Sequence, residues 1–197
     1  MKFVLASRNA HKLEEMQQIL SAQGIEVMLQ SDIGLDLEVE EIGETFLENA
    51  RLKAIAVMQA SGLPAIADDS GLCVNCLNGG PGIYSARYGG EGLTDKERYE
   101  LLLELTAGQA QRAARFVSVI VCALPNGDLL EAEGSCEGKL AYAPRGEGGF
   151  GYDPIFFLPT LKKTFAQLTE EEKNQVSHRA NALRNFQQVW QNYQAKQ

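Results

Sequence analysis

The sequence has little of what several classes of protein require, and the first scarcity is cysteine. Only 4 of its 197 residues are cysteine, which is too few for a disulfide-based scaffold of this length, so we expect reduced thiols. No apolar run approaches the roughly 18 residues that a membrane span needs. Residues 1–5 lead straight into polar Ser7, without the apolar core of a signal peptide. These absences predict a cytoplasmic protein that has no membrane partner.

Positive charge is also scarce. The chain carries 18 lysine and arginine residues against 26 aspartate and glutamate residues, which gives a net charge of −8. A protein that tracks DNA or RNA normally presents a basic face, so we expect no nucleic acid polymer as a partner. A small anion stays open as a ligand, provided that a local basic cluster or a metal ion offsets the overall repulsion.

The sequence does contain a regular alternation of strand-like and helix-like segments, with no repeats and no polar linker. Residues 2–6 and 25–29 have strand patterns, and residues 11–23 between them have the pattern of an amphipathic helix that stops at Gly24. Further helix starts are predicted by capping boxes, in which a threonine is followed three residues later by a glutamate. These boxes begin at Thr45, Thr94 and Thr169.

A β-hairpin is predicted in the second half of the chain, where residues 115–124 and 129–139 flank a turn that contains Asn126-Gly127. The hairpin requires antiparallel neighbours, whereas the strand–helix–strand start favours parallel pairing. We therefore expect an α/β fold with a mixed sheet flanked by helices. No shift in composition marks a boundary, so residues 1–197 are expected to form a single domain with two lobes.

Cys73 and Cys76 have the spacing of a metal or redox pair. They lie in an apolar, strand-like stretch, and the chain has no second pair of this kind. We interpret them as buried structural thiols rather than as ligands of zinc.

The first candidate functional segment is residues 7–12, Ser-Arg-Asn-Ala-His-Lys, between the first strand and the first helix. Backbone N–H groups at a helix start attract anions, and Ser7, Asn9 and Lys12 add side-chain donors suited to phosphate. The segment lacks the glycine-rich pattern of a P-loop. Taken alone, it is also typical of an ordinary helix-capping turn.

The second segment is residues 67–71, Ala-Asp-Asp-Ser-Gly, which follows the short apolar run 65–67 and is therefore expected at a strand end. Asp68 and Asp69 can present oxygen ligands to a hard cation such as Mg²⁺, and Glu40 or Glu41 can add another. We favour this metal site over the alternative, which is a capped turn.

The third segment is residues 150–154, Phe-Gly-Tyr-Asp-Pro, which is followed later in the chain by Lys173 and by Ser-His-Arg at residues 177–179. An aromatic face, a carboxylate and several cationic donors together suit a flat polar ring such as a purine. The local alternatives are a tight turn that leads into the apolar strand 155–157, and a surface or capping role for His178.

Together these segments resemble the family of inosine/xanthosine triphosphate pyrophosphatases, which hydrolyse non-standard purine nucleoside triphosphates. The resemblance spans nearly the whole chain, and the segments occur in family order. They are residues 7–12, 40, 43, 45–50, 53, 67–71, 81–87, 149–154, 173 and 177–179. Arg8 departs from the glycine that is common in relatives, which bears on the backbone shape of the loop.

The resemblance implies a twisted sheet, two lobes around a central substrate cleft, a homodimer and Mg²⁺ as cofactor. The implied reaction is attack of water on the α-phosphorus, which yields a nucleoside monophosphate and pyrophosphate. Glu40 and Asp69 would hold Mg²⁺, with Asp68 as a further ligand, and Asp69 would also orient or deprotonate the water.

The resemblance and the residue chemistry together assign the substrate-binding residues. Phosphates are assigned to Ser7, Asn9, Lys12 and Lys53, with a hydroxyl contact from Ser70. Phe150 would stack on the base, and the base edge would be read by Asp153, Lys173, His178 and Arg179. The remaining members of the set are Arg8, Ala10, His11, Gly151 and Tyr152.

Two other functions stay open at this point. One is a pyrophosphatase that acts on other modified nucleotides, and the other is a regulator that binds nucleotides without catalysis. The acidic residues Glu40, Asp68 and Asp69 favour catalysis, because a pure sensor has no need to activate water.

Overall fold

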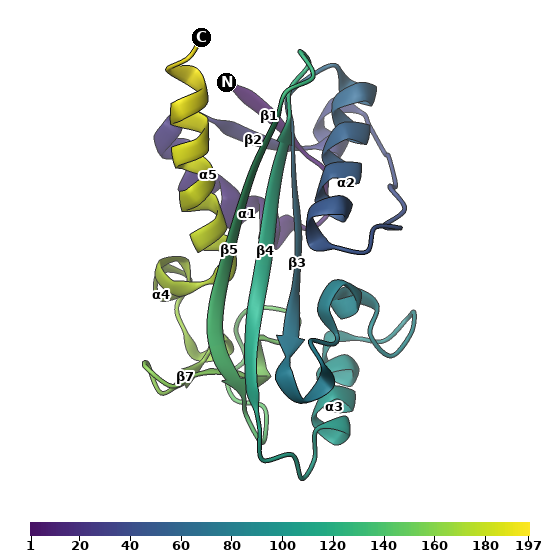
Figure 1. The fold of residues 1–197 in the computed structure, drawn as a ribbon, viewed down its shortest axis with the longest axis vertical. Helices are drawn as coiled ribbons and strands as arrows, with labels where there is room; N and C mark the ends of the chain where they lie inside the picture. The colour runs from purple at the N-terminus through teal and green to yellow at the C-terminus, as the bar shows by residue number, and fades with distance from the viewer. The chain divides into compact units, whose positions relative to one another are not determined.

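The computed structural model of the protein describes residues 1–197, and Figure 1 shows its ribbon. Its strands are β1 (Lys2–Leu5), β2 (Glu26–Leu29), β3 (Ala65–Val74), β4 (Ala113–Ala123), β5 (Leu129–Leu140), β6 (Phe156–Leu158) and β7 (Lys163–Thr164). Its α-helices are α1 (Ala10–Leu20), α2 (Phe46–Ser61), α3 (Asp95–Leu105), α4 (Glu170–Val176) and α5 (His178–Gln194). None of the helices is both long enough and apolar enough to span a bilayer.

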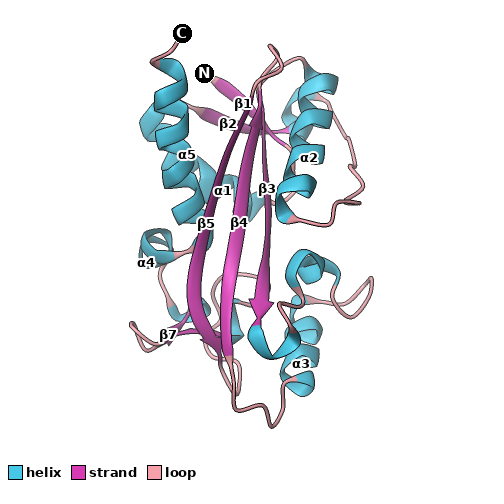
Figure 2. Ribbon diagram, viewed as in Figure 1, coloured by secondary structure: helices cyan, strands magenta, loops and turns pink.

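The seven strands form one open sheet in the order β2-β1-β3-β4-β5-β6-β7. Figure 2 shows the long central strands β3, β4 and β5 side by side. Strand β1 pairs in parallel with β2 and with β3, because α1 and α2 return the chain to the same edge between successive strands. Strand β6 pairs antiparallel with β5 and with β7. The mixed α/β sheet predicted from the sequence is therefore confirmed.

The predicted helix ends follow the expected capping chemistry. At the start of α2, Thr45 Oγ1 accepts a hydrogen bond from Glu48 N at 3.1 Å, and Glu48 Oε2 accepts one from Thr45 N at 3.2 Å. The same reciprocal pairs start α3 and α4, so all three predicted capping boxes are confirmed. Helix α1 ends at Leu20, three residues earlier than predicted, and a 3₁₀ turn carries the chain to Gly24, whose φ is 68°.

The predicted hairpin is also present, with its turn between the end of β4 at Ala123 and the start of β5 at Leu129. Leu124 N donates to Asp128 O at 2.9 Å, and Gly127 N donates to Leu124 O at 2.9 Å. Gly127 has a φ of 93°, a conformation that glycine adopts without steric cost.

The prediction that a strand ends near Ala67 is wrong, because β3 continues through Asp68 and Asp69 to Val74. Both aspartate side chains are buried within the strand. A buried carboxylate is tolerated where cations and hydrogen-bond donors compensate it. The partners that compensate Asp68 lie at least 50 residues away in the sequence. The local run of polar residues therefore predicted too early an end for the strand.

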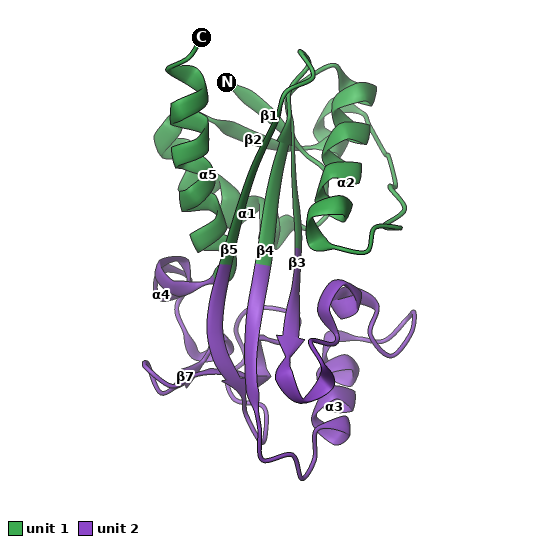
Figure 3. Cartoon of the chain, in the orientation of Figure 1, with its two compact units in different colours: residues 1–69, 118–134, 178–197 green, residues 70–117, 135–177 purple.

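The chain divides into two compact units, shown in Figure 3. The first unit contains Met1–Asp69, Ser118–Gly134 and His178–Gln197, and the second contains Ser70–Val117 and Ser135–Ser177. Strands β3, β4 and β5 each contribute residues to both units. The single domain with two lobes stays a prediction.

The first unit has a core in which α1 and α5 contact each other and cover one face of the sheet. Phe3 and Leu5 of β1 lie in this core, and the ring of Phe3 meets the ring of Trp190 edge-on at 5.2 Å. Successive strand residues point to opposite faces, so Val4 points to the other face, where α2 packs on β1 (Figure 1). The strand segment Ala65–Asp69 is therefore enclosed on both faces.

The second unit has its own aromatic core. The ring centroids of Phe116 and Phe165 are 5.6 Å apart in a stacked arrangement, and Phe156 meets each of them edge-on at 4.7 Å.

All four cysteines of the chain are free. Cys73 and Cys76 are half-buried rather than buried as predicted; Cys73 lies within β3, and Cys76 lies in the turn after the strand ends at Val74.

Candidate active site

The segment that joins β1 to α1 is a helix-capping turn. Asn9 Oδ1 accepts hydrogen bonds from His11 N at 3.0 Å and from Lys12 N at 3.3 Å, and Asn9 N donates to Ser7 Oγ at 3.1 Å. These bonds fix the backbone of the turn. Ala10 and His11 are exposed, whereas the Lys12 side chain extends inward and is only 16% exposed.

Asp68 is the centre of a buried charged cluster. Its Oδ1 accepts a hydrogen bond from Ser118 Oγ at 2.6 Å, and its Oδ2 accepts from Arg179 Nη2 at 2.9 Å and lies 2.9 Å from Lys12 Nζ. Burial acts to raise the pKa of Asp68, but the charges of Arg179 and Lys12 outweigh it and hold that pKa well below its usual value. The carboxylate of Asp68 is therefore ionised, and both of its oxygens have partners within the protein.

Two lysines meet at the backbone of the same residue. Lys12 Nζ and Lys53 Nζ each donate to the carbonyl oxygen of Asp68 at 3.2 Å. Burial lowers the pKa of Lys12, and the neighbouring charges of Arg179 and Lys53 act in the same direction while Asp68 opposes them. The two ammonium groups thus meet at one carbonyl oxygen, where both could donate to the oxygens of a polyphosphate.

Asp69 points to the other face of β3, where α2 supplies its partner. Lys53 Nζ lies 2.6 Å from Asp69 Oδ1 and 2.7 Å from Glu41 Oε1, so one ammonium bridges two carboxylates. Burial raises the pKa of Asp69, although Lys53 acts to lower it. The second oxygen of this carboxylate, Oδ2, is buried and has no hydrogen-bond partner.

The surroundings of the Lys53 ammonium are suited to a hard cation. Its three neighbours are Glu41 Oε1, Asp69 Oδ1 and the Asp68 carbonyl oxygen, which are the ligand types that Mg²⁺ takes. The unpartnered Asp69 Oδ2 adds a further oxygen. The donor set therefore fits a divalent cation bound at Glu41 and Asp69.

The metal ligands expected from the sequence are not all brought together. Glu40 is exposed, and Asp68 is used by Arg179, Lys12 and Ser118. No group of three or more histidine, cysteine, aspartate or glutamate side chains gathers at one point in the chain. Glu41, which the sequence left open beside Glu40, is the glutamate that reaches Lys53, and no feature of the local sequence distinguishes the two.

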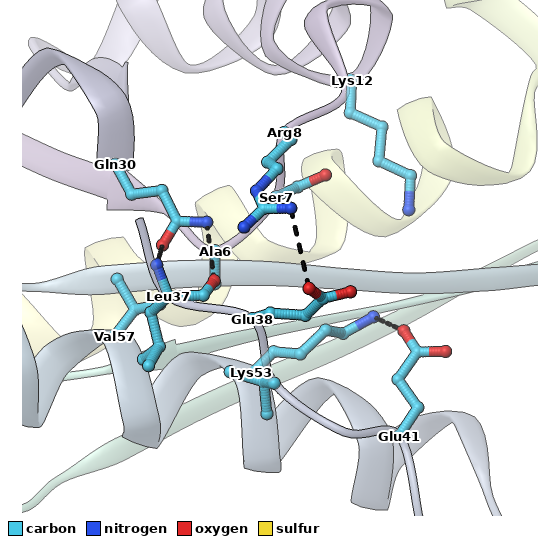
Figure 4. A pocket seen from close by; sticks show the side chains of 11 residues that line it. Ala6, Ser7, Arg8, Lys12, Gln30, Leu37, Glu38, Glu41, Lys53 and Val57 are labelled. Atoms are coloured by element: carbon cyan, nitrogen blue, oxygen red, sulfur yellow. Dashed lines mark hydrogen bonds and ion pairs between the residues drawn. The ribbon is translucent and has the colours of Figure 1, made fainter. Parts of the chain in front are cut away.

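A pocket of about 230 Å³ lies beside these groups in the first unit, as Figure 4 shows. Its polar lining comes from the turn after β1, the loop before α2, and α2 itself. Arg8 at its edge lies 2.6 Å from Asp36 and 3.8 Å from Glu38, and all three side chains are more than half exposed. The lining residues are Ala6, Ser7, Arg8, Lys12, Gln30, Leu37, Glu38, Val39, Glu41, Lys53 and Val57.

In the second unit, Phe150 lies in a loop that several hydrogen bonds hold in place. Asp153 Oδ2 accepts hydrogen bonds from Phe150 N at 3.0 Å and from Lys173 Nζ at 2.8 Å, and that Nζ lies 4.8 Å from the centroid of the Phe150 ring. Gly149 has a φ of 74°, and a Cβ there would lie 2.0 Å from Asp153 Oδ2. Asp95 Oδ2 accepts from Gly151 N at 2.7 Å, which fixes the loop to the start of α3.

Other residues expected at the base have structural partners of their own. The Tyr152 hydroxyl donates to the Ser85 carbonyl at 2.8 Å, and the side chain is buried. Burial raises the pKa of Tyr152, so it stays protonated. Arg179 is held between Asp68 and Glu15 in the first unit, and His178 is the buried first residue of α5.

Sequence reasoning missed two residues of the charged cluster, Glu15 and Ser118. Glu15 pairs with Arg179 from helix α1, and Ser118 donates to Asp68 from strand β4. Neither residue stands in a recognisable motif. Ser70 is half-buried in β3, and its contact with the substrate stays a prediction.

Comparison with known proteins matches this chain over almost its full length. The sequence model described as the Ham1 family matches residues 3–189. A dITP/XTP pyrophosphatase from Thermus thermophilus is 52% identical over 187 residues, which are 93% of this chain and 89% of that protein. A dITP/XTP pyrophosphatase from Desulfotalea psychrophila is 51% identical over 180 residues, which are 91% of this chain and 81% of that protein.

Solved structures agree with these sequence matches. The Ham1 protein of Staphylococcus aureus superimposes with a TM-score of 0.89 and 43% identity, covering 98% of this chain and 100% of that one. A nucleoside-triphosphatase / dITP/XTP pyrophosphatase from Mycobacterium abscessus gives a TM-score of 0.76 and 41% identity, covering 93% of this chain and 97% of that one. On the family match and on this level of identity, the chain belongs to the Ham1 family.

Proposed function

We propose that this protein hydrolyses non-standard purine nucleoside triphosphates, such as dITP and XTP, to the nucleoside monophosphate and pyrophosphate. The observation that carries the proposal is the meeting of Lys12 and Lys53 at the Asp68 carbonyl, directly beside the partly unpartnered carboxylate of Asp69. Two ammonium donors at the Asp68 carbonyl and the neighbouring acid Asp69 suit hydrolysis of a polyphosphate. The names of the Thermus and Desulfotalea relatives support the choice of substrate.

We assign phosphate binding to the first unit. Lys12 and Lys53 supply two half-buried ammonium groups, and Ser7 and the α1 turn supply hydroxyl and amide donors at a helix start. A triphosphate carries about four negative charges, which must be balanced before a nucleophile can approach. Arg8 adds a third cation at the edge of the pocket.

We place a divalent cation, Mg²⁺, at Glu41 and Asp69 rather than at Glu40 and Asp68. A cation bound there would replace the Lys53 ammonium at Glu41 and Asp69 and would leave that ammonium to a phosphate. When bound, Mg²⁺ neutralises phosphate charge and lowers the pKa of water. Asp68 instead orients Lys12 and Arg179 through its two oxygens.

Asp69 is the proposed residue that orients the attacking water and accepts its proton. Its Oδ2 is buried without a hydrogen-bond partner, so it is available to a ligand. Mg²⁺ bound beside it would make water acidic enough for a carboxylate to accept the proton near neutral pH.

Base recognition is assigned to Phe150, which the loop 149–153 holds in place. One side of its ring faces the Lys173 ammonium, and stacking on a purine would use the ring as a platform. Hypoxanthine and xanthine carry a carbonyl at C6 where adenine carries an amino group. A donor such as Lys173 would form a hydrogen bond with the carbonyl, whereas the amino group of adenine would face it as a second donor.

We propose that the protein acts in the cytoplasm as a homodimer on a free nucleotide. The alternative of a nucleotide-binding regulator is disfavoured by Asp69, because a buried carboxylate oxygen without a hydrogen-bond partner suits activation of water, for which a regulator has no need.

The first prediction concerns the substrate. Purified protein should release pyrophosphate and monophosphate from dITP and XTP with Mg²⁺, and should release far less from dATP, dGTP and dTTP. A chelator should abolish the release, because the lysines alone then balance the phosphate charge and no metal ion lowers the pKa of the attacking water. Binding of dITP without cleavage under any of these conditions would favour the regulator.

The second prediction concerns Asp69. Asp69→Asn keeps the shape of the side chain but removes the base, so kcat for dITP should fall roughly 10²- to 10⁴-fold while circular dichroism stays unchanged. Glu14→Gln, at an exposed acid of α1, is the control and should retain activity. Near-normal turnover by Asp69→Asn would remove this residue from its proposed role.

The third prediction concerns the Phe150 ring. Loss of a stacking contact worth about 1–3 kcal/mol should raise KM for dITP about 5- to 150-fold in Phe150→Ala. Phe150→Tyr keeps a ring and should stay close to the original KM. Unchanged kinetics in the alanine variant would mean that the ring serves only to pack the loop.

A further inference from the structure

The first turn of α2 holds the loop before it by an unusual set of side-chain bonds. Asn49 is fully buried, and its Oδ1 accepts a hydrogen bond from Gly43 N at 2.8 Å. Glu48 Oε2 accepts from Glu44 N at 2.7 Å and from Thr45 N at 3.2 Å. Two side chains of one helix therefore bind three consecutive backbone N–H groups, at residues 43–45.

Gly43 is required by space rather than by its backbone conformation. A Cβ at this position would lie 2.7 Å from Asn49 Oδ1 and 2.7 Å from Glu48 Cβ, closer than real Cβ contacts allow. The loop backbone is therefore pressed directly against the helix. Any side chain at position 43 would push the loop away from Asn49.

Asn49 is a poor choice for stability alone. Its Nδ2 is buried and has no hydrogen-bond partner, and a buried donor without a partner costs stability. An apolar side chain of similar volume would fill the position without that cost. The bond to Gly43 is what the asparagine supplies and an apolar residue cannot.

The loop held by Asn49 carries Glu41. Asn49 and Lys53 are four residues apart on α2, so they lie on the same face of the helix, one turn from each other. Asn49 binds the loop backbone at Gly43, and Lys53 pairs with the Glu41 side chain two residues earlier at 2.7 Å. The same Lys53 contacts Asp69 at 2.6 Å, so the helix sets the position of Glu41 relative to Asp69.

We propose that Asn49 is a positioning residue for the metal site, because it holds the Glu41 loop where Glu41 and Asp69 can share one divalent cation. This inference rests on the proposed function. Asn49 makes no contact with the substrate in this proposal. Replacement of Asn49 should therefore change the affinity for the metal ion and not the recognition of the nucleotide.

The test uses Mn²⁺ alone as the probe, with free Mn²⁺ measured by electron paramagnetic resonance. Asn49→Leu removes the acceptor but fills the volume, and it should weaken Mn²⁺ binding about 10- to 100-fold, as loss of a ligand-orienting partner does. The Mg²⁺ concentration for half-maximal dITP hydrolysis should rise in parallel. KM for dITP at saturating Mg²⁺ should stay near its original value, because Lys12 and Phe150 are untouched.

Two further variants make the result specific. Gly43→Ala should reproduce the loss of Mn²⁺ affinity, because the new methyl group pushes the loop from Asn49. Ala54→Gly, at a buried position of the same helix, should lower the melting temperature and leave Mn²⁺ affinity unchanged.

The inference is overturned if folded Asn49→Leu and Gly43→Ala bind Mn²⁺ like the original protein, if the original protein binds none, or if neither variant folds. Hydrolysis of dITP by the original protein would in each of those cases leave the proposed function standing. Conversely, Mn²⁺ binding that depends on Asn49 in a protein without hydrolytic activity would refute the function and keep the positioning role.

Discussion

The buried carboxylate of Asp68 is the interaction on which the first unit depends. It joins strand β3 to α1 through Lys12, to β4 through Ser118 and to α5 through Arg179. A buried charge is tolerated only when it is paired and hydrogen-bonded, and removing one partner leaves the rest uncompensated. The elements that carry these partners are therefore fixed around one point of the sheet.

The chemistry follows from the alternation of side chains along β3. Asp68 points to the face covered by α1 and α5, while Asp69 points to the face covered by α2. The Asp68 carbonyl lies between the two faces and accepts from a lysine on each of them. The two adjacent acids therefore differ. Asp68 pairs with the side chains of Lys12 and Arg179, whereas Asp69 keeps one oxygen without a hydrogen-bond partner.

Local signals in the sequence predicted much of this structure, because local bonds create the corresponding features. Each capping box is a pair of bonds between residues three apart, and the hairpin depends on the Asn126-Gly127 turn. The length of β3 and the role of Asp68 could not be predicted in this way. Arg179 is 111 residues away from Asp68 in the chain, and Ser118 is 50 residues away.

The site residues show the same division. Lys12, Lys53 and Asp69 come from motifs that the sequence displays, and the structure brings them together. The choice of Glu41 over Glu40 depends on how the loop is held by α2, which no periodic pattern records. Glu15 was missed for a similar reason, because its contact with Arg179 forms only when α1 and α5 pack.

The central claim is that Lys12 and Lys53 form one polyphosphate site around the Asp68 carbonyl. Calorimetric titration with inorganic pyrophosphate and Mg²⁺ tests it most directly, in the original protein and in Lys12→Met and Lys53→Met, which keep most of the apolar stem. The account predicts one pyrophosphate per chain and markedly weaker binding in each variant. Binding of undiminished strength in both variants would contradict it.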